Sequence, residues 1–258
     1  MKINRLAVRL CMCALVLFRA LSLYADGKDS LSRKMIHIAG IDVKPAYVFP
    51  THEFFSGNNA TFSPIRKNLS VHLKYGFKFA PDTYFGRMYP HGVQGIGVGY
   101  NTFFHSSELG TPWSVYAFQT SRIASLTPRL SLDYEWNFGA SFGWKKYDAE
   151  SNPYNRVVGS KMNAYIHLSF LLNWQLDAQT NLRAGIGATH FSNGNTAYPN
   201  AGVNTLGASI GLTRYFGGTS RVTLADGSSG LVRRPPFKPY VSYDLIVYGA
   251  TRKKSVFP

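Results

Sequence analysis

Cysteine is almost absent from this chain of 258 residues. Its only two cysteines, Cys11 and Cys13, lie inside an apolar segment close to the N-terminus. Beyond that segment the chain has no thiol to form a disulfide, attack a substrate or bind a metal. The sequence also lacks a tight cluster of His, Asp and Glu residues of the kind that binds zinc. We therefore expect no metal site.

Long apolar runs are missing too, once the N-terminal segment has been passed. None approaches the roughly 20 residues that a membrane-spanning helix needs, so a membrane span would have to be made by strands. The N-terminal segment has the pattern of a secretory signal, because Lys2, Arg5 and Arg9 precede an apolar stretch that ends near Ala25. An uncleaved membrane anchor is the alternative. We expect a signal peptide at residues 1–25 and one β domain at residues 26–258.

Acidic residues are scarce, with 13 Asp and Glu against 28 Lys and Arg, and the net charge is +15. The basic residues are scattered over loops and strand ends, without the dense basic run that binds nucleic acid, so we expect no nucleic-acid partner. A lipopolysaccharide surface is a dense array of phosphates and suits the same charge. Charged residues make up only 16% of the chain and aromatic residues 15%, which favours strands over solvated helices.

What the chain does contain is a recurrent alternation of apolar and polar residues. In residues 160–174, for example, Ile166 and Leu168 fall on one face of an extended strand, and His167 and Ser169 fall on the other. A barrel that faces lipid outside and water inside needs this pattern, although a soluble sandwich shows it too. Nine segments are predicted strands: 36–49, 67–79, 92–104, 112–123, 129–138, 160–174, 181–192, 203–216 and 238–250.

The connections between these segments mostly alternate between long and short, as in outer-membrane barrels, whose long loops lie outside. We predict an all-β fold, an antiparallel membrane-spanning β-barrel of about 8 to 10 strands in a bacterial outer membrane. Nine is an odd number for such a barrel, and residues 217–237 form a long connection where a short turn is expected. No amphipathic strand follows Lys254, so the sequence predicts a shortened C-terminus.

One motif carries chemistry. The segment His190-Phe191-Ser192-Asn193-Gly194-Asn195, followed by Pro199-Asn200-Ala201-Gly202-Val203-Asn204, resembles the active-site signature of the PagL-like lipid A deacylase family. The alternation places His190 and Ser192 on the apolar, outward face of one strand, and Asn204 begins the next strand on the same face. Residues i and i+2 of a strand are about 6.5 to 7 Å apart, so the imidazole could reach the serine hydroxyl.

The resemblance implies an esterase that removes an ester-linked acyl chain from lipid A in the outer leaflet, without a cofactor. It implies Ser192 as nucleophile, His190 as general base and acid, and Asn204 as the residue that orients His190. The family usually has a glutamate in place of Asn204; an asparagine can accept a hydrogen bond but brings no charge. Asn193, Gly194 and Asn200 are candidates for stabilising the oxyanion or positioning the substrate.

Two other functions are compatible with the sequence. A catalytically silent barrel that binds lipopolysaccharide or has a structural role is suggested by Asn204 and by the abrupt C-terminus. A small diffusion pore is the weaker alternative, because a barrel of this size has a lumen filled largely by side chains. The sequence leaves open whether the barrel is a monomer or a homodimer.

Three further patterns resemble catalytic or phosphate-binding motifs. The strings 139–143 and 207–211 have the form Gly-x-Ser-x-Gly of a nucleophile elbow, and Gly95, Gly97 and Gly99 resemble a phosphate loop. All three lie along alternating strands rather than at strand-to-helix turns. We therefore expect small residues that pack closely against lumen side chains, and no chemistry.

Overall fold

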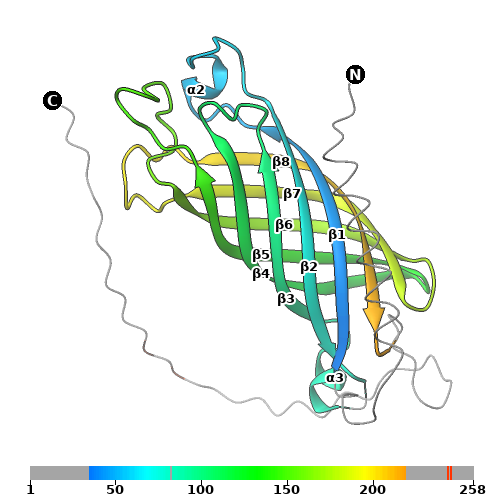
Figure 1. Ribbon diagram of the computed structural model, residues 1–258. Coiled ribbons are helices and arrows are strands. Elements are labelled where there is room, and N and C mark those ends of the chain that lie inside the picture. Colours follow the sequence, from blue (N-terminus) through cyan, green and yellow to red (C-terminus); the bar gives the residue numbers. More distant parts are fainter. Residues whose placement is uncertain (1–34, 82, 219–242, 244, 246–258) are drawn as a thin grey trace.

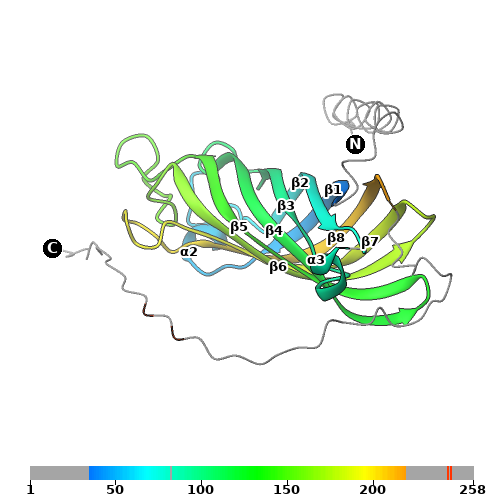
Figure 2. The same cartoon turned by 90° about the horizontal axis from the view of Figure 1, so that it is seen from below.

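The described residues form one closed barrel of eight antiparallel strands, in which each strand pairs with its neighbours in the chain and β8 pairs with β1. This computed structural model describes residues 35–81, 83–218, 243 and 245. Figures 1 and 2 show the barrel from two directions. The strands are β1 (Met35–Val48), β2 (Lys67–Phe79), β3 (Val93–Thr102), β4 (Gly110–Thr127), β5 (Leu130–Trp144), β6 (Met162–Gln175), β7 (Thr180–Ser192) and β8 (Val203–Phe216).

The strand count falls within the predicted range, and the antiparallel barrel is confirmed. Eight of the nine predicted strands are present, with β4 and β5 both longer than predicted. The ninth predicted strand, at 238–250, lies almost entirely outside the described residues. So do the predicted signal peptide at 1–25 and the predicted shortened C-terminus. None of the helices in the described part of the chain is long and apolar enough to cross a membrane.

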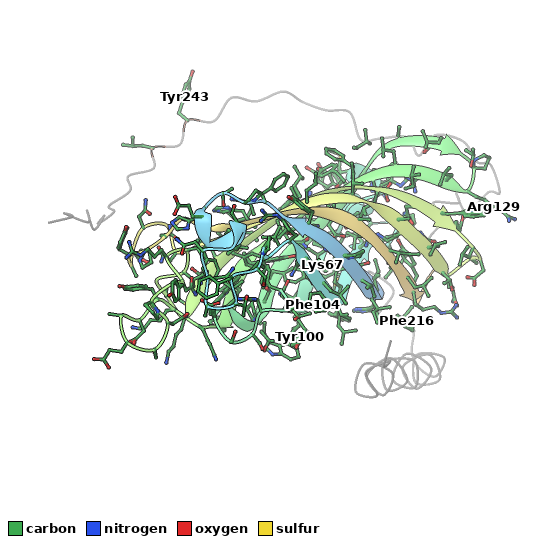
Figure 3. The ribbon with its side chains drawn as sticks, turned by 90° about the horizontal axis from the view of Figure 1, so that it is seen from above. Lys67, Tyr100, Phe104, Arg129, Phe216 and Tyr243 are labelled. Carbon is green, nitrogen blue, oxygen red and sulfur yellow. The ribbon has the colours of Figure 1, made fainter. Side chains whose placement is uncertain are left out.

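The antiparallel order places alternate connections at opposite ends of the barrel. One end carries the connections 49–66, 103–109, 145–161 and 193–202, and we call it the outer end. The opposite end carries the connections 80–92, 128–129 and 176–179, and we call it the inner end. The short helix α2 (Glu53–Ser56) lies at the outer end, and α3 (Tyr84–Met88) lies at the inner end (Figure 1). In Figure 3, Arg129 and Phe216 mark the end opposite α2.

The predicted alternation between faces is present on the barrel wall. On β6, Ile166, Leu168 and Phe170 point outward and are 44–48% exposed, whereas His167 and Ser169 are buried in the lumen. An apolar outer face and a polar lumen are what a barrel surrounded by lipid requires. Isolated charges in the lumen would be costly. Four of the lumen charges, those of Asp42, Lys74, Glu135 and Arg183, are paired with one another.

The central pairing in the lumen involves side chains from four strands. The Lys74 ammonium lies 2.5 Å from the Asp42 carboxylate and 2.9 Å from that of Glu135, and the Arg183 guanidinium also contacts Glu135. Asp133 and Glu135 thus point inward, as the pattern predicts. The predicted tight packing of the glycines is also present: an added Cβ at Gly99 would meet the His72 ring at 2.5 Å.

A hydrophobic cluster closes the lumen at the outer end. Its members come from α2, from the outer connections and from the inward faces of the strands, and they are all buried. The Phe191 ring packs against Phe103, Trp144 and Tyr165 at centroid distances of 5.1–6.3 Å. Phe191 lies between His190 and Ser192 in the chain, so this cluster supports the motif from the lumen side.

The register of the strands shows how far they tilt from the barrel axis. A line that crosses the strands through paired residues starts at Ser192 on β7, passes through Ala164 and Ala140, and returns to β7 at Leu182, ten residues nearer the inner end. Such an offset around eight strands corresponds to strands inclined by about 40° to the barrel axis. In the direction from β7 to β6 and β5, the line therefore descends from the outer end towards the membrane interior.

Candidate active site

The structure places the predicted catalytic residues at the outer end of β7 and β8. His190 and Ser192 are at the end of β7, and Asn204 is at the start of β8. The register places His190 directly opposite Asn204, and their side chains are joined by a hydrogen bond of 2.7 Å between Nδ1 and Oδ1. All three residues are half-buried.

This hydrogen bond fixes the state of the imidazole. An amide oxygen can only accept, so Nδ1–H of His190 donates to Oδ1 of Asn204. In the neutral ring, Nε2 then carries the lone pair and is the basic atom. Ser192 is two residues further along β7 and on the same face, so its hydroxyl and the imidazole of His190 lie on the same side of the strand.

The loop between the two strands is built by asparagines. The Asn193 amide N–H donates to Oδ1 of Asn200 at 3.1 Å, and Nδ2 of Asn193 donates to the Ala197 carbonyl at 2.9 Å. Nδ2 of Asn200 in turn donates to Oδ1 of Asn195 at 3.0 Å. The side-chain amides of Asn193 and Asn200, which were expected to stabilise an oxyanion or position the substrate, therefore stabilise the loop itself.

The third candidate, Gly194, offers a backbone donor for that role. Gly194 and Asn195 both adopt left-handed backbone conformations, with φ of 63° and 61°. The Gly194 amide makes no hydrogen bond with any of the described residues, and Gly194 is exposed. An unpaired amide two residues after the serine is the kind of donor that stabilises a tetrahedral oxyanion.

Gly202 is a site residue to which the sequence analysis gave no role. Its φ is +73°, and a Cβ added there would lie 3.2 Å from Cε1 of His190 and 3.7 Å from Cβ of Ser192. The Gly202 amide also donates to the Val157 carbonyl at 3.4 Å, which ties this loop to the β5–β6 connection. Gly202 stands two residues before Asn204 in the motif, which is the signal that could have identified it.

The surroundings of the site on the barrel wall are apolar. Across the β6–β7 pairing, Ile166 is opposite His190 and Ala164 is opposite Ser192. The carboxylates of Asp133 and Glu135 are 5% and 1% exposed and point into the lumen, so neither can replace Asn204 beside His190. The two nucleophile-elbow serines, Ser141 and Ser209, are also buried on the lumen side.

Comparison with known proteins bears on this arrangement. Residues 94–213, which include the whole His190–Asn204 motif, match the family model described as lipid A 3-O-deacylase (PagL). This part of the chain is similar to the PagL family. The match confirms the resemblance that the motif predicted. A search of curated proteins finds no match.

Solved structures with a similar chain path include an outer membrane enzyme and a surface protein. The outer membrane enzyme PagL is 12% identical with a TM-score of 0.44, and covers 67% of this chain and 97% of its own. Neisserial surface protein A (NspA) is 9% identical with a TM-score of 0.43, and covers 70% of this chain and 96% of its own. The family match together with the closed antiparallel barrel identifies the chain as a membrane-spanning β-barrel of the bacterial outer membrane.

Proposed function

We propose that this barrel is a serine esterase that hydrolyses an ester-linked acyl chain of lipid A in the outer leaflet. Ser192 is the nucleophile, His190 the general base and then acid, and Asn204 the residue that orients His190. The observation that carries the proposal is the 2.7 Å bond from His190 Nδ1 to Asn204 Oδ1, because it leaves Nε2 as the base on the face that Ser192 shares.

In the first half of the reaction, Nε2 of His190 takes the proton of the Ser192 hydroxyl as Oγ attacks the carbonyl carbon of the ester. The amide N–H of Gly194 donates to the oxyanion that forms. The C–O bond to the sugar then breaks, and Nε2–H of His190 returns the proton to the sugar oxygen. The product is an acyl group bound to Ser192 through an ester.

In the second half, Nε2 of His190 takes a proton from a water molecule that attacks the acyl carbonyl. Collapse of this second intermediate breaks the bond to Ser192 Oγ, which takes the proton back, and the fatty acid leaves. Asn204 keeps the Nδ1–H tautomer throughout both halves, although as a neutral group it does not stabilise the imidazolium by charge.

The barrel wall suits an acyl chain attached at Ser192. Small side chains at Ala164 and Ala140 continue from Ser192 across β6 and β5. Large, exposed apolar side chains flank the two alanines. Phe138 and Ile166 lie on the side nearer the inner end of the barrel, and Phe142 and Met162 lie on the side nearer the outer end. Because the register makes this line descend into the membrane, the acyl chain would remain in the hydrocarbon layer while its ester is at the outer rim.

The test is release of fatty acid from purified lipid A by the refolded barrel in detergent. We expect release by the wild-type chain and by the Ser209→Ala variant, which loses a serine hydroxyl in the lumen, and none by Ser192→Ala. If the wild-type chain, shown to be folded, releases no fatty acid, the proposal is wrong. Lipid binding that is equal in wild type and Ser192→Ala would then support the silent lipopolysaccharide-binding barrel.

A further inference from the structure

A second polar site lies inside the barrel, in the inner half of the lumen. It is a cavity of about 40 Å³, enough for roughly three water molecules. Residues of all eight strands line it, and those that matter for its chemistry are Lys78, Arg122, Asn173, Arg183, Thr213 and Tyr215. We call it the inner lumen cavity. It has no contact with the His190 and Ser192 face, which is on the outside of the wall.

The charges around the inner lumen cavity are unbalanced by one lysine. Three cations of this region have a carboxylate partner: Lys74 pairs with Asp42 and Glu135, Arg183 pairs with Glu135, and Arg122 lies 3.8 Å from Asp133. Lys78 is only 4% exposed and has no carboxylate partner among the described residues. Its ammonium instead lies 5.8 Å from the centre of the Tyr215 ring.

A cation buried to this extent normally has an anion beside it, because desolvation of an unpaired charge costs several kcal/mol. A cation–π contact of this length compensates for only part of that cost. The side chain of Arg122 is 28% exposed, so solvent reaches this end of the lumen. A small anion beside Lys78 would balance the charge.

Other polar groups of the cavity residues indicate what kind of anion fits. Nε of Arg183 and Oγ1 of Thr213 are buried and make no hydrogen bond with the described residues, so each has a proton to donate. Oδ1 of Asn173 is likewise buried and without a donor. Together with the Lys78 ammonium, these groups offer three donors and one acceptor.

We propose that the inner lumen cavity binds a small oxyanion that carries a proton, of the class of hydrogen phosphate. Its bare oxygens would accept from Lys78, Arg183 and Thr213, and its hydroxyl would donate to Asn173. Chloride could accept from the three donors but would leave the Asn173 oxygen unpaired. The bound anion would stabilise the folded barrel from inside and would take no part in chemistry at Ser192.

The experiment measures the thermal unfolding midpoint of the refolded barrel in detergent while inorganic phosphate replaces chloride at constant ionic strength. Because a ligand of the folded state stabilises it by mass action, we expect the midpoint to rise with phosphate concentration and then saturate. In Lys78→Met, the apparent dissociation constant for phosphate should rise about tenfold or more, since a charge-assisted hydrogen bond is lost. Lys161→Met, which removes an exposed lysine, should behave as the wild type.

Calorimetric titration of folded protein with phosphate gives the same constant without relying on unfolding. Thr213→Val, which retains every charge, should weaken binding less than Lys78→Met does. The proposal is wrong if the wild-type midpoint shows no saturable dependence on phosphate, or if Lys78→Met responds as strongly as Lys161→Met. Equal stabilisation by chloride alone would overturn the assignment to an oxyanion.

Discussion

Replacing Asn204 by aspartate tests the role of the His190–Asn204 hydrogen bond. Aspartate has the shape of asparagine, so a carboxylate oxygen would occupy the position of Oδ1, 2.7 Å from Nδ1 of His190. The substitution therefore changes the charge of the acceptor while the distance and the cross-strand register stay the same. A glutamate would place the acceptor one methylene further from β8.

The size of the effect follows from the strength of the two hydrogen bonds. A neutral hydrogen bond is worth about 0.5–1.5 kcal/mol, and one with a charged partner about 1.5–3 kcal/mol. The imidazolium that forms at His190 during proton transfer would gain the difference, about 1–2 kcal/mol, in the transition state. We therefore expect Asn204→Asp to raise kcat about 5- to 30-fold.

The assay is the initial rate of fatty acid release from lipid A by equal amounts of folded barrel. Asn204→Leu is the matched control, because it has a similar size and removes the acceptor. We expect it to lower kcat about tenfold or more, since the Nδ1–H tautomer loses its partner. If both substitutions leave kcat unchanged, Asn204 does not orient the base and this reading of the site is refuted.

Four further outcomes follow from particular contacts. Gly202→Ala should destabilise the barrel by about 1–2 kcal/mol through its left-handed backbone, and should lower activity about ten- to a hundredfold by displacing His190; urea unfolding and fatty acid release measure the two effects. Glu135→Gln should cost about 3–5 kcal/mol of unfolding free energy, because the buried Arg183 loses its carboxylate partner and Lys74 loses one of its two, while the folded fraction stays active. Ser209→Ala should keep full activity, and a loss would mean that the second elbow string contributes to catalysis. Hydrogen bonds from the backbone amide of Gln179 and from Thr180 lower the pKa of the Asp177 carboxyl. The turn at residues 176–179 should therefore be stabilised at neutral pH and lose that stabilisation only as the pH falls below about 4. Amide exchange at Gln179 would detect the loss.

The strands could be predicted because lipid and lumen impose opposite demands on alternate residues. The segments 67–79 and 203–216 match β2 and β8 to the residue. β5 was predicted to end at residue 138, yet it continues to Trp144. Its last residues, Gly139 to Gly143, are mostly small, so the contrast between the two faces that reveals a strand is lost there.

The candidate site could be placed for the same reason. Two residues on one face of β7 and one on the matching face of β8 come close together if the hairpin closes in register, and the register does pair His190 with Asn204. The roles of Asn193 and Asn200 could not be predicted, because a loop asparagine can bind a substrate or its own backbone equally well. Only the structure shows that both make bonds within the loop.

The hydrophobic cluster at the outer end was also beyond prediction. Phe54, Phe103 and Trp144 are far apart in the sequence, and no periodic pattern connects them. They meet because three outer connections fold over the same opening of the barrel. The Lys78 environment was missed for a similar reason, since alternation shows that a lysine points inward but not which charges face it.

The central claim is that Ser192 cleaves an acyl ester of lipid A, and mass spectrometry of lipid A tests it most directly. Cells would express either the wild-type chain or Ser192→Ala, with equal barrel assembly verified for both. We predict that lipid A loses the mass of one hydroxyacyl chain only in cells that express the wild-type chain. Unchanged lipid A in both strains, or the same loss in both, would contradict the claim.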